Sequence, residues 1–173
     1  KAFVEAAEAA GIAETYCSYH KILMGAAFSG ILPKPKFIIN TSMICDANNL
    51  TFRALADYYD VPQFYIDIPT SADEESIKYV ADQLREMTAF IEEHTGRKLD
   101  ENVLKQYAVR TKETIDNFKE CLELKKDTTI PNDITSEMYE VFLTHPMLGT
   151  EETLKYSQML KEDLKNAPKK SGI

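Results

Sequence analysis

Two short β-rich segments separated by one helical segment constrain the fold of this chain most. Residues 36–42 read KFIINTS and residues 63–69 read QFYIDIP, and both are rich in residues that favour strands. Between them, residues 48–62 (NNLTFRALADYYDVP) have the apolar spacing of an amphipathic helix. A strand, a helix and a strand within about 35 residues form a βαβ unit, whose strands are parallel. The pattern therefore predicts a parallel sheet layer here.

Helical patterns precede and follow this unit. Residues 1–10 and 18–29 have helical spacing, with Gly11 and Gly30 where these helices would end. No convincing strand pattern follows residue 70. Four further helices are predicted, over residues 71–96, 99–127, 135–148 and 150–168. In the first of them we expect a serine cap, an acidic first turn and an end at Gly96, and in the third a break at Pro146.

These patterns predict an α/β fold in the N-terminal part of the chain and an all-helical C-terminal part. We expect residues 1–70 to form an α/β half, residues 71–167 a helical region, and residues 168–173 a linker-like tail. The chain begins at Lys1 rather than at a methionine. Together with the tail, this start leads us to expect a piece of a longer protein.

Composition argues against several classes of function. The net charge of −8 argues against nucleic-acid binding, which needs a basic surface. No apolar run reaches about 18 residues, so no membrane span is expected. The three cysteines have no disulfide-framework spacing, which favours a reducing, cytoplasmic setting. The sequence also has no glycine-rich phosphate loop, so we expect no nucleotide site on this chain.

The stretch ICDANN, residues 44–49, places Cys45 directly after a predicted strand and before a helix. In parallel α/β folds, ligands bind outside the carboxyl ends of the strands. The helix start offers free N–H groups and a positive dipole end, which stabilise a thiolate or an anionic cluster. The alternative is a buried cysteine followed by residues that cap the helix, namely Asp46, Asn48 and Asn49. The position favours the functional interpretation.

The stretch YCSYHK, residues 16–21, places Cys17 at the start of another predicted helix. Ser18 could cap that helix, and His20 and Lys21 could be exposed residues of its first turn. Taken alone, this motif supports packing and function equally.

The remaining cysteine and histidines favour structural roles. Cys121 lies within a long predicted helix, on the apolar face beside Phe118, and so favours packing. His94 and His145 have no partners at metal-ligand spacing, so we expect surface or capping positions for them.

With both cysteine motifs in view, the chain resembles a known family. The stretch ETYCSYHKILMGAAFSGILPKPKFIINTSMICDANNLTFRALADYYDVPQFYIDIP, residues 14–69, resembles the first half of a subunit of the 2-hydroxyacyl-CoA dehydratases. Benzoyl-CoA reductases belong to the same superfamily. The stretch FIEEHTGRKLDENVL, residues 90–104, is similar to the helical region that follows in those subunits.

The resemblance implies an enzyme built from several parts. Each subunit of a heterodimer would hold a four-iron four-sulfur (4Fe-4S) cluster, and an ATP-hydrolysing activator protein would supply one electron. The electron would pass to the thioester carbonyl of a 2-hydroxyacyl-CoA. The resulting ketyl radical anion would expel the hydroxyl group, and the electron would then be returned.

The resemblance also implies ligands for the cluster. Cys17 and Cys45 match two thiolate ligands by position. The family draws a third cysteine from a second α/β domain, and Cys121 does not match the context of that cysteine. We therefore expect the second α/β domain to be absent from this chain, which alone would be inactive and would hold a cluster poorly or not at all.

Residues beside the two matched cysteines acquire roles by the same resemblance. Ser18 would place a hydroxyl near the substrate carbonyl as a catalytic group. His20, Asp46 and Asn48 would surround the ligands.

Two other interpretations remain open. A reductase of the same superfamily would act on an aromatic or enoyl thioester. In a non-enzymatic interpretation, the cysteines would be buried and the helical half would mediate assembly.

Overall fold

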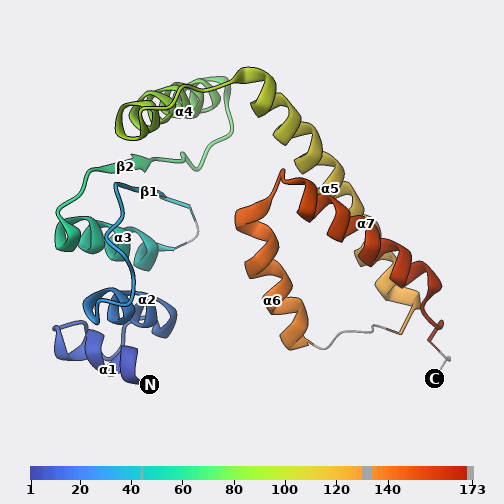
Figure 1. Ribbon diagram of the computed structural model, residues 1–173, viewed down its shortest axis with the longest axis horizontal. Helices are drawn as coiled ribbons and strands as arrows, with labels where there is room; N and C mark the ends of the chain where they lie inside the picture. The colour runs from blue at the N-terminus through green and yellow to red at the C-terminus, as the bar shows by residue number, and fades with distance from the viewer. Residues whose placement is uncertain (44, 130–133, 171–173) are drawn as a thin grey trace. The chain divides into compact units, whose positions relative to one another are not determined.

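A computed structural model describes residues 1–43, 45–129 and 134–170 of the chain (Figure 1). The contacts divide the chain into two compact units, Lys1–Lys98 and Leu99–Ile173. Within the described ranges, no helix is both long enough and apolar enough to cross a membrane.

The first unit contains the predicted βαβ arrangement. Its elements are α1 (Ala2–Ala9), α2 (Ser18–Phe28), β1 (Ile38–Thr41), α3 (Asp46–Tyr59), β2 (Gln63–Ile66) and α4 (Glu74–Thr95). The two strands are parallel, with Ile38 opposite Gln63 and Thr41 opposite Ile66. The prediction of a parallel sheet from the strand–helix–strand pattern is therefore confirmed, although each strand is only four residues long.

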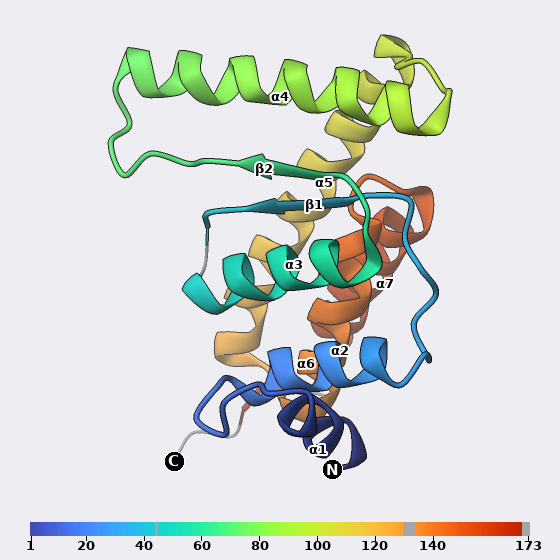
Figure 2. The ribbon, with the colours of Figure 1, turned by 90° about the vertical axis from the view of Figure 1, so that its left-hand side faces the viewer.

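The helices of this unit form layers on the strand pair. α3 packs against β1 and α4 against β2, on opposite sides of the strands (Figure 2). α2 packs on α3, and α1 packs on α2. The apolar core lies on the side of β1 that faces α3, and it extends to α2 and α1. Its buried members are Ala7, Met24, Ala27, Ile38, Leu55 and Ala56.

Gly25 allows α1 and α2 to approach each other closely. A Cβ atom built at this position would lie 1.8 Å from the carbonyl oxygen of Phe3. No side chain fits in that space, so α1 reaches the face of α2 only because residue 25 is a glycine.

The helix starts differ from those that the sequence predicted. Ser71 does not cap α4; the N-cap is Asp73, whose carboxylate accepts a hydrogen bond from the Ser76 backbone N–H at 2.8 Å. Asp73 is favoured over serine because its charge also complements the helix dipole. The predicted end at Gly96 is confirmed, since this residue is the C-cap of α4 with a φ of 70°.

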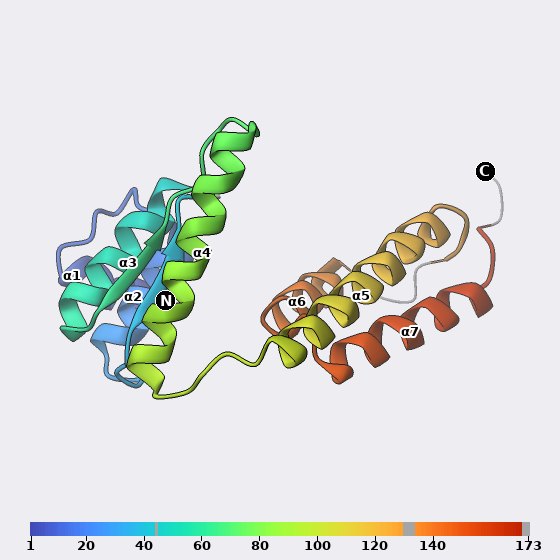
Figure 3. The same ribbon diagram turned by 90° about the horizontal axis from the view of Figure 1, so that it is seen from above.

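The second unit is helical. It contains α5 (Glu101–Asp127), α6 (Ile134–Thr144), the 3-10 turn η1 (His145–Met147) and α7 (Glu151–Asn166). α5 and α7 lie side by side (Figure 3). The turn η1 carries Pro146 where α6 ends, which confirms the predicted break.

The core of the second unit lies between α5 and α7. Cys121, Leu160 and Leu164 are its buried apolar residues. Beside them, the Asn117 amide donates to the Ser157 hydroxyl at 3.1 Å, so these two buried side chains are paired with each other.

The boundary between the two compact units comes later in the chain than the change from α/β to all-helical structure. The described residues after Ile66 contain no strand of a sheet, in line with the helical region predicted from residue 71. The contacts, however, divide the chain after Lys98, because α4 packs on β2 and so stays with the first unit.

Candidate functional site

Both cysteines of the first unit are the N-cap residues of helices. Cys17 precedes α2 and Cys45 precedes α3, and neither helix start has a side-chain cap. Both thiol side chains are exposed. The N–H groups of each first turn and the positive end of each helix dipole are therefore available to a negative group held by these sulfurs.

This arrangement corrects the predicted caps. Ser18 is the first residue of α2 rather than its cap. Asp46, Asn48 and Asn49 likewise do not cap α3, because the chain turns into the helix one residue earlier, at Cys45.

The asparagines after Cys45 contact the end of the strand instead. The Asn48 amide donates to the Thr41 carbonyl at 3.4 Å, and the Asn40 amide donates to the Asn49 side-chain oxygen at 3.5 Å. Thr41 is the last residue of β1. Cys45 therefore lies near the carboxyl end of this strand, the edge where parallel α/β folds bind ligands.

Two contacts join the start of α2 to the start of α3. The Tyr16 hydroxyl donates to the Ala47 carbonyl at 2.8 Å and lies 3.0 Å from the hydroxyl of buried Thr51. The His20 Nε2 atom lies 3.8 Å from the Cys45 sulfur. The structure thus brings together the two cysteine motifs, which are separated by a strand in the sequence.

His20 and Lys21 are buried, so the interpretation of both as exposed first-turn residues is wrong. His20 is 5% exposed and Lys21 is 4% exposed. The Lys21 ammonium donates to the Glu8 carboxylate at 2.6 Å and to the Glu14 carbonyl at 2.7 Å. Its charge is thereby paired, as a buried cation requires.

The pairing of Lys21 was not predicted from the sequence. It depends on α1 packing against α2, which brings Glu8 beside the lysine. In the sequence, the only signal for this helix contact was an apolar face on each of the two short helices. The backbone N–H of Lys21 donates to the Cys17 carbonyl at 3.0 Å, so the residue that carries the ion pair also closes the first turn of α2.

The remaining cysteine and histidines belong to other elements than α2 and α3, namely α5, α4 and η1. Cys121 is 2% exposed in the core of the second unit, and burial raises the pKa of its thiol. His94 packs against the rings of Phe37 and Phe90 in the first unit. His145 is exposed in η1.

The side chains present fit a thiolate-binding group. Exposed thiols at two helix starts are soft ligands of the type that holds iron–sulfur clusters. No group of three or more potential metal ligands occurs among the residues that the structure describes. The donor type fits such a cluster, for which Cys17 and Cys45 are the candidate ligands.

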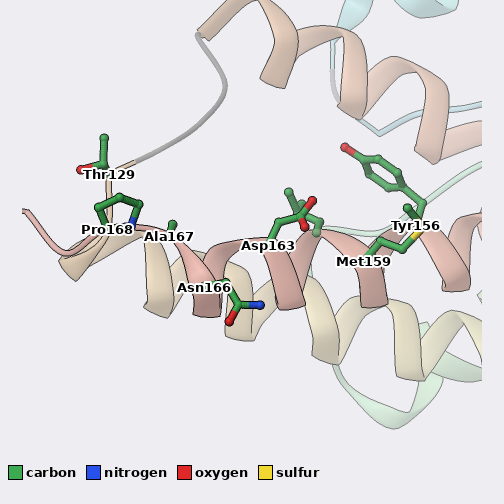
Figure 4. A pocket seen from close by; sticks show the side chains of 8 residues that line it. Thr129, Tyr156, Met159, Asp163, Asn166, Ala167 and Pro168 are labelled. Carbon is green, nitrogen blue, oxygen red and sulfur yellow. The ribbon is translucent and has the colours of Figure 1, made fainter.

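The second unit also contains hollows, which are lined by residues outside the two cysteine motifs. One is lined along α7 by Tyr156, Met159 and Asp163, and at its other end by Thr129 and Pro168 (Figure 4). Burial and the nearby Glu140 carboxylate raise the pKa of Tyr156 to about 12, so this phenol stays protonated at neutral pH. Neither exposed cysteine takes part in this hollow.

Comparison with known proteins gives matches to dehydratases of CoA thioesters. The family model described as "2-hydroxyglutaryl-CoA dehydratase, D-component" matches residues 1–172. The (R)-phenyllactyl-CoA dehydratase alpha subunit of Clostridium sporogenes is 30% identical over 107 residues, covering 57% of this chain and 26% of the relative. The alpha subunit of (R)-2-hydroxyglutaryl-CoA dehydratase from Acidaminococcus fermentans is 29% identical over 79 residues, covering 43% of this chain and 17% of the relative. The matched segments thus span about a quarter or less of these relatives.

Proposed function

This chain belongs to the 2-hydroxyglutaryl-CoA dehydratase D-component family, and on that premise we propose that it forms part of an iron–sulfur 2-hydroxyacyl-CoA dehydratase subunit. Cys17 and Cys45 would be two ligands of a 4Fe-4S cluster. The observation that supports this assignment is their shared geometry. Each is an exposed N-cap residue without a side-chain cap, and contacts from Tyr16 and His20 join the two helix starts.

The helix starts suit a negatively charged cluster for an electrostatic reason. A helix N-terminus carries a partial positive charge and unpaired N–H groups. Two such ends beside the ligating sulfurs stabilise the added negative charge. When bound, the cluster supplies one-electron transfer. The protein groups would hold it and orient it.

Side chains next to the two cysteines would contact the substrate or the ligands. Ser18 is exposed directly after Cys17, and its hydroxyl would donate a hydrogen bond to the substrate thioester carbonyl. Asp46 is exposed directly after Cys45. Asn48 bonds to the end of β1 and so would hold the Cys45 turn in place.

The substrate would be a 2-hydroxyacyl-CoA, and the partners would be a second dehydratase subunit and an ATP-dependent activator. The activator would deliver one electron, through which the thioester carbonyl becomes a ketyl radical anion that expels the 2-hydroxyl group. A proton would then leave C3 and combine with the expelled hydroxide, and the electron would be returned. The net change is therefore the loss of water from the substrate.

The non-enzymatic alternative required buried cysteines in both motifs. Cys17 and Cys45 are exposed, which removes the packing argument for these two positions. Cys121 alone fits that interpretation.

The test is anaerobic reconstitution of the chain with iron, sulfide and excess small thiol, which can supply ligands that the chain lacks. We expect a brown protein with visible absorption and a paramagnetic signal after reduction. Cys17→Ala and Cys45→Ala should each lose most of the bound iron, because each removes one of two protein ligands.

Cys121→Ala is the matched control and should retain the iron of the unmodified chain, since this thiol is buried in the other unit. Iron content that is unchanged in Cys45→Ala, or lost only in Cys121→Ala, would contradict the ligand assignment. So would an unmodified chain that takes up no iron under these conditions.

A further inference from the structure

The His20 imidazole occupies a closed position at the junction of α2 and α3. It is 5% exposed. The rings of Tyr16 and Tyr19 meet it edge-on, with ring centroids at 6.1 Å and 5.3 Å. Its Nε2 atom lies 3.8 Å from the Cys45 sulfur, which is within hydrogen-bond range for sulfur. The two rings restrict rotation of the imidazole and keep Nε2 facing the sulfur.

The other nitrogen of the ring decides where the proton lies. Within the described ranges, His20 Nδ1 is buried and has no hydrogen-bond partner. A neutral imidazole carries one proton on either nitrogen. A proton on Nδ1 would leave a buried N–H donor unpaired, and buried unpaired donors are rarer than buried acceptors with an unused lone pair.

We propose that His20 is a positioning residue whose Nε2–H group donates a hydrogen bond to the Cys45 sulfur. The bond fixes the direction of the sulfur at the start of α3. Cys17 has no equivalent donor among the contacts that the structure describes. The two sulfurs would therefore differ in electron density although both lie at helix starts.

The consequence for a bound cluster rests on the proposed function, whereas the tautomer itself does not. Hydrogen bonds to ligating sulfurs withdraw electron density and raise the reduction potential of an iron–sulfur cluster. Loss of the His20 donor should therefore lower the midpoint potential and make the cluster harder to reduce.

The first experiment reads the tautomer in the chain without metal. The chain has three histidines, so a long-range nitrogen–proton correlation spectrum at neutral pH is simple to interpret. The His20 signals are identified by their loss in His20→Gln. We expect a proton on Nε2. A ring protonated on Nδ1 alone would overturn the proposal.

The second experiment separates the hydrogen bond from the packing of the ring. His20→Phe keeps an aromatic ring between the tyrosines and removes the donor. His20→Gln keeps an N–H donor near the position of Nε2. After reconstitution, we expect a downward shift of the midpoint potential in His20→Phe and a value close to that of the unmodified chain in His20→Gln.

Equal potentials in all three proteins would contradict the positioning role, and equal downward shifts in both variants would assign the effect to packing instead. Circular dichroism verifies that each variant is folded. If no variant and no unmodified chain takes up a cluster, the proposed function fails, while the spectrum of the metal-free chain still decides the tautomer.

Discussion

The Tyr16 hydroxyl donates a 2.8 Å hydrogen bond to the carbonyl oxygen of Ala47, which joins the start of α2 to the first turn of α3. The same hydroxyl lies 3.0 Å from that of Thr51, which is fully buried. One phenol thus holds together the two helix starts that carry Cys17 and Cys45.

Replacing this phenol should weaken both stability and iron binding. Tyr16→Phe leaves the buried Thr51 hydroxyl without this partner, so we expect a loss of about 1–2 kcal/mol in the free energy of unfolding, measured in urea. We also expect less bound iron after reconstitution, because the two cysteine motifs are no longer tied together.

Tyr59→Phe is the matched control for that variant. It removes a comparable hydrogen bond, from the Tyr59 hydroxyl to the Leu32 carbonyl at 3.2 Å. This control should lose a similar amount of stability and bind iron normally. Equal iron contents in the two variants would show that Tyr16 has no special relation to the site.

The buried ion pair of Lys21 should matter more than an exposed one. Lys21→Met leaves Glu8 without its cation and the Glu14 carbonyl without a donor, so we expect a loss of about 1–3 kcal/mol. Lys78→Met removes the exposed pair with Asp82 and should have a smaller effect, because solvent screens this pair. Urea unfolding of both variants is the measurement, and a larger effect at Lys78 would refute this ranking.

The contact at Gly25 should tolerate no added methyl group. Gly25→Ala places a Cβ against the Phe3 carbonyl, so we expect α1 to separate from α2 and a loss of about 1–3 kcal/mol or more. Gly30→Ala adds a Cβ that meets no atom within 4 Å, so its cost comes from the backbone φ of +72° and this packing should stay intact. Amide hydrogen exchange should show lost protection of α1 in Gly25→Ala alone, and protection retained in both variants would contradict the close-approach argument.

The second unit should lose stability in alkali. Burial raises the pKa of the Cys121 thiol, and burial together with Glu140 raises that of Tyr156 to about 12. Both groups are neutral when protonated. Their contribution to the stability of the folded state is therefore fully present below the unfolded pKa values of about 8.5 and 10. It is lost as the pH rises through the higher folded values.

Urea midpoints between about pH 8 and pH 11 measure this loss. Tyr156→Phe keeps the ring and removes the titrating hydroxyl, so the decline above about pH 10 should become shallower. If the urea midpoint falls with the same slope in both proteins, Tyr156 does not contribute to the loss of stability.

Some features of the fold could be read from local patterns alone. The alternation of strand and helix patterns between residues 36 and 69 was enough to predict parallel strands, because a connection through a helix brings the second strand back in the same direction. Pro146 and Gly96 marked helix ends correctly, since the limits on their backbone angles are properties of the residue itself.

The capping pattern was less reliable. Ser71 was predicted as a cap and Ser18 was considered as one, yet the N-cap residues are Asp73 and Cys17. Several polar residues stand near each start, and only the path of the chain into the helix selects one of them.

Tertiary structure alone decided the surroundings of the two cysteine motifs. The sequence by itself determined that Cys17 and Cys45 would lie at helix starts, because that depends on neighbouring residues. The burial of His20 and Lys21 depends on α1 and α3 packing on the two sides of α2. Burial is set by which helix faces meet, and that contact joins residues distant in the chain, so no local pattern around His20 could reveal that it faces the Cys45 sulfur.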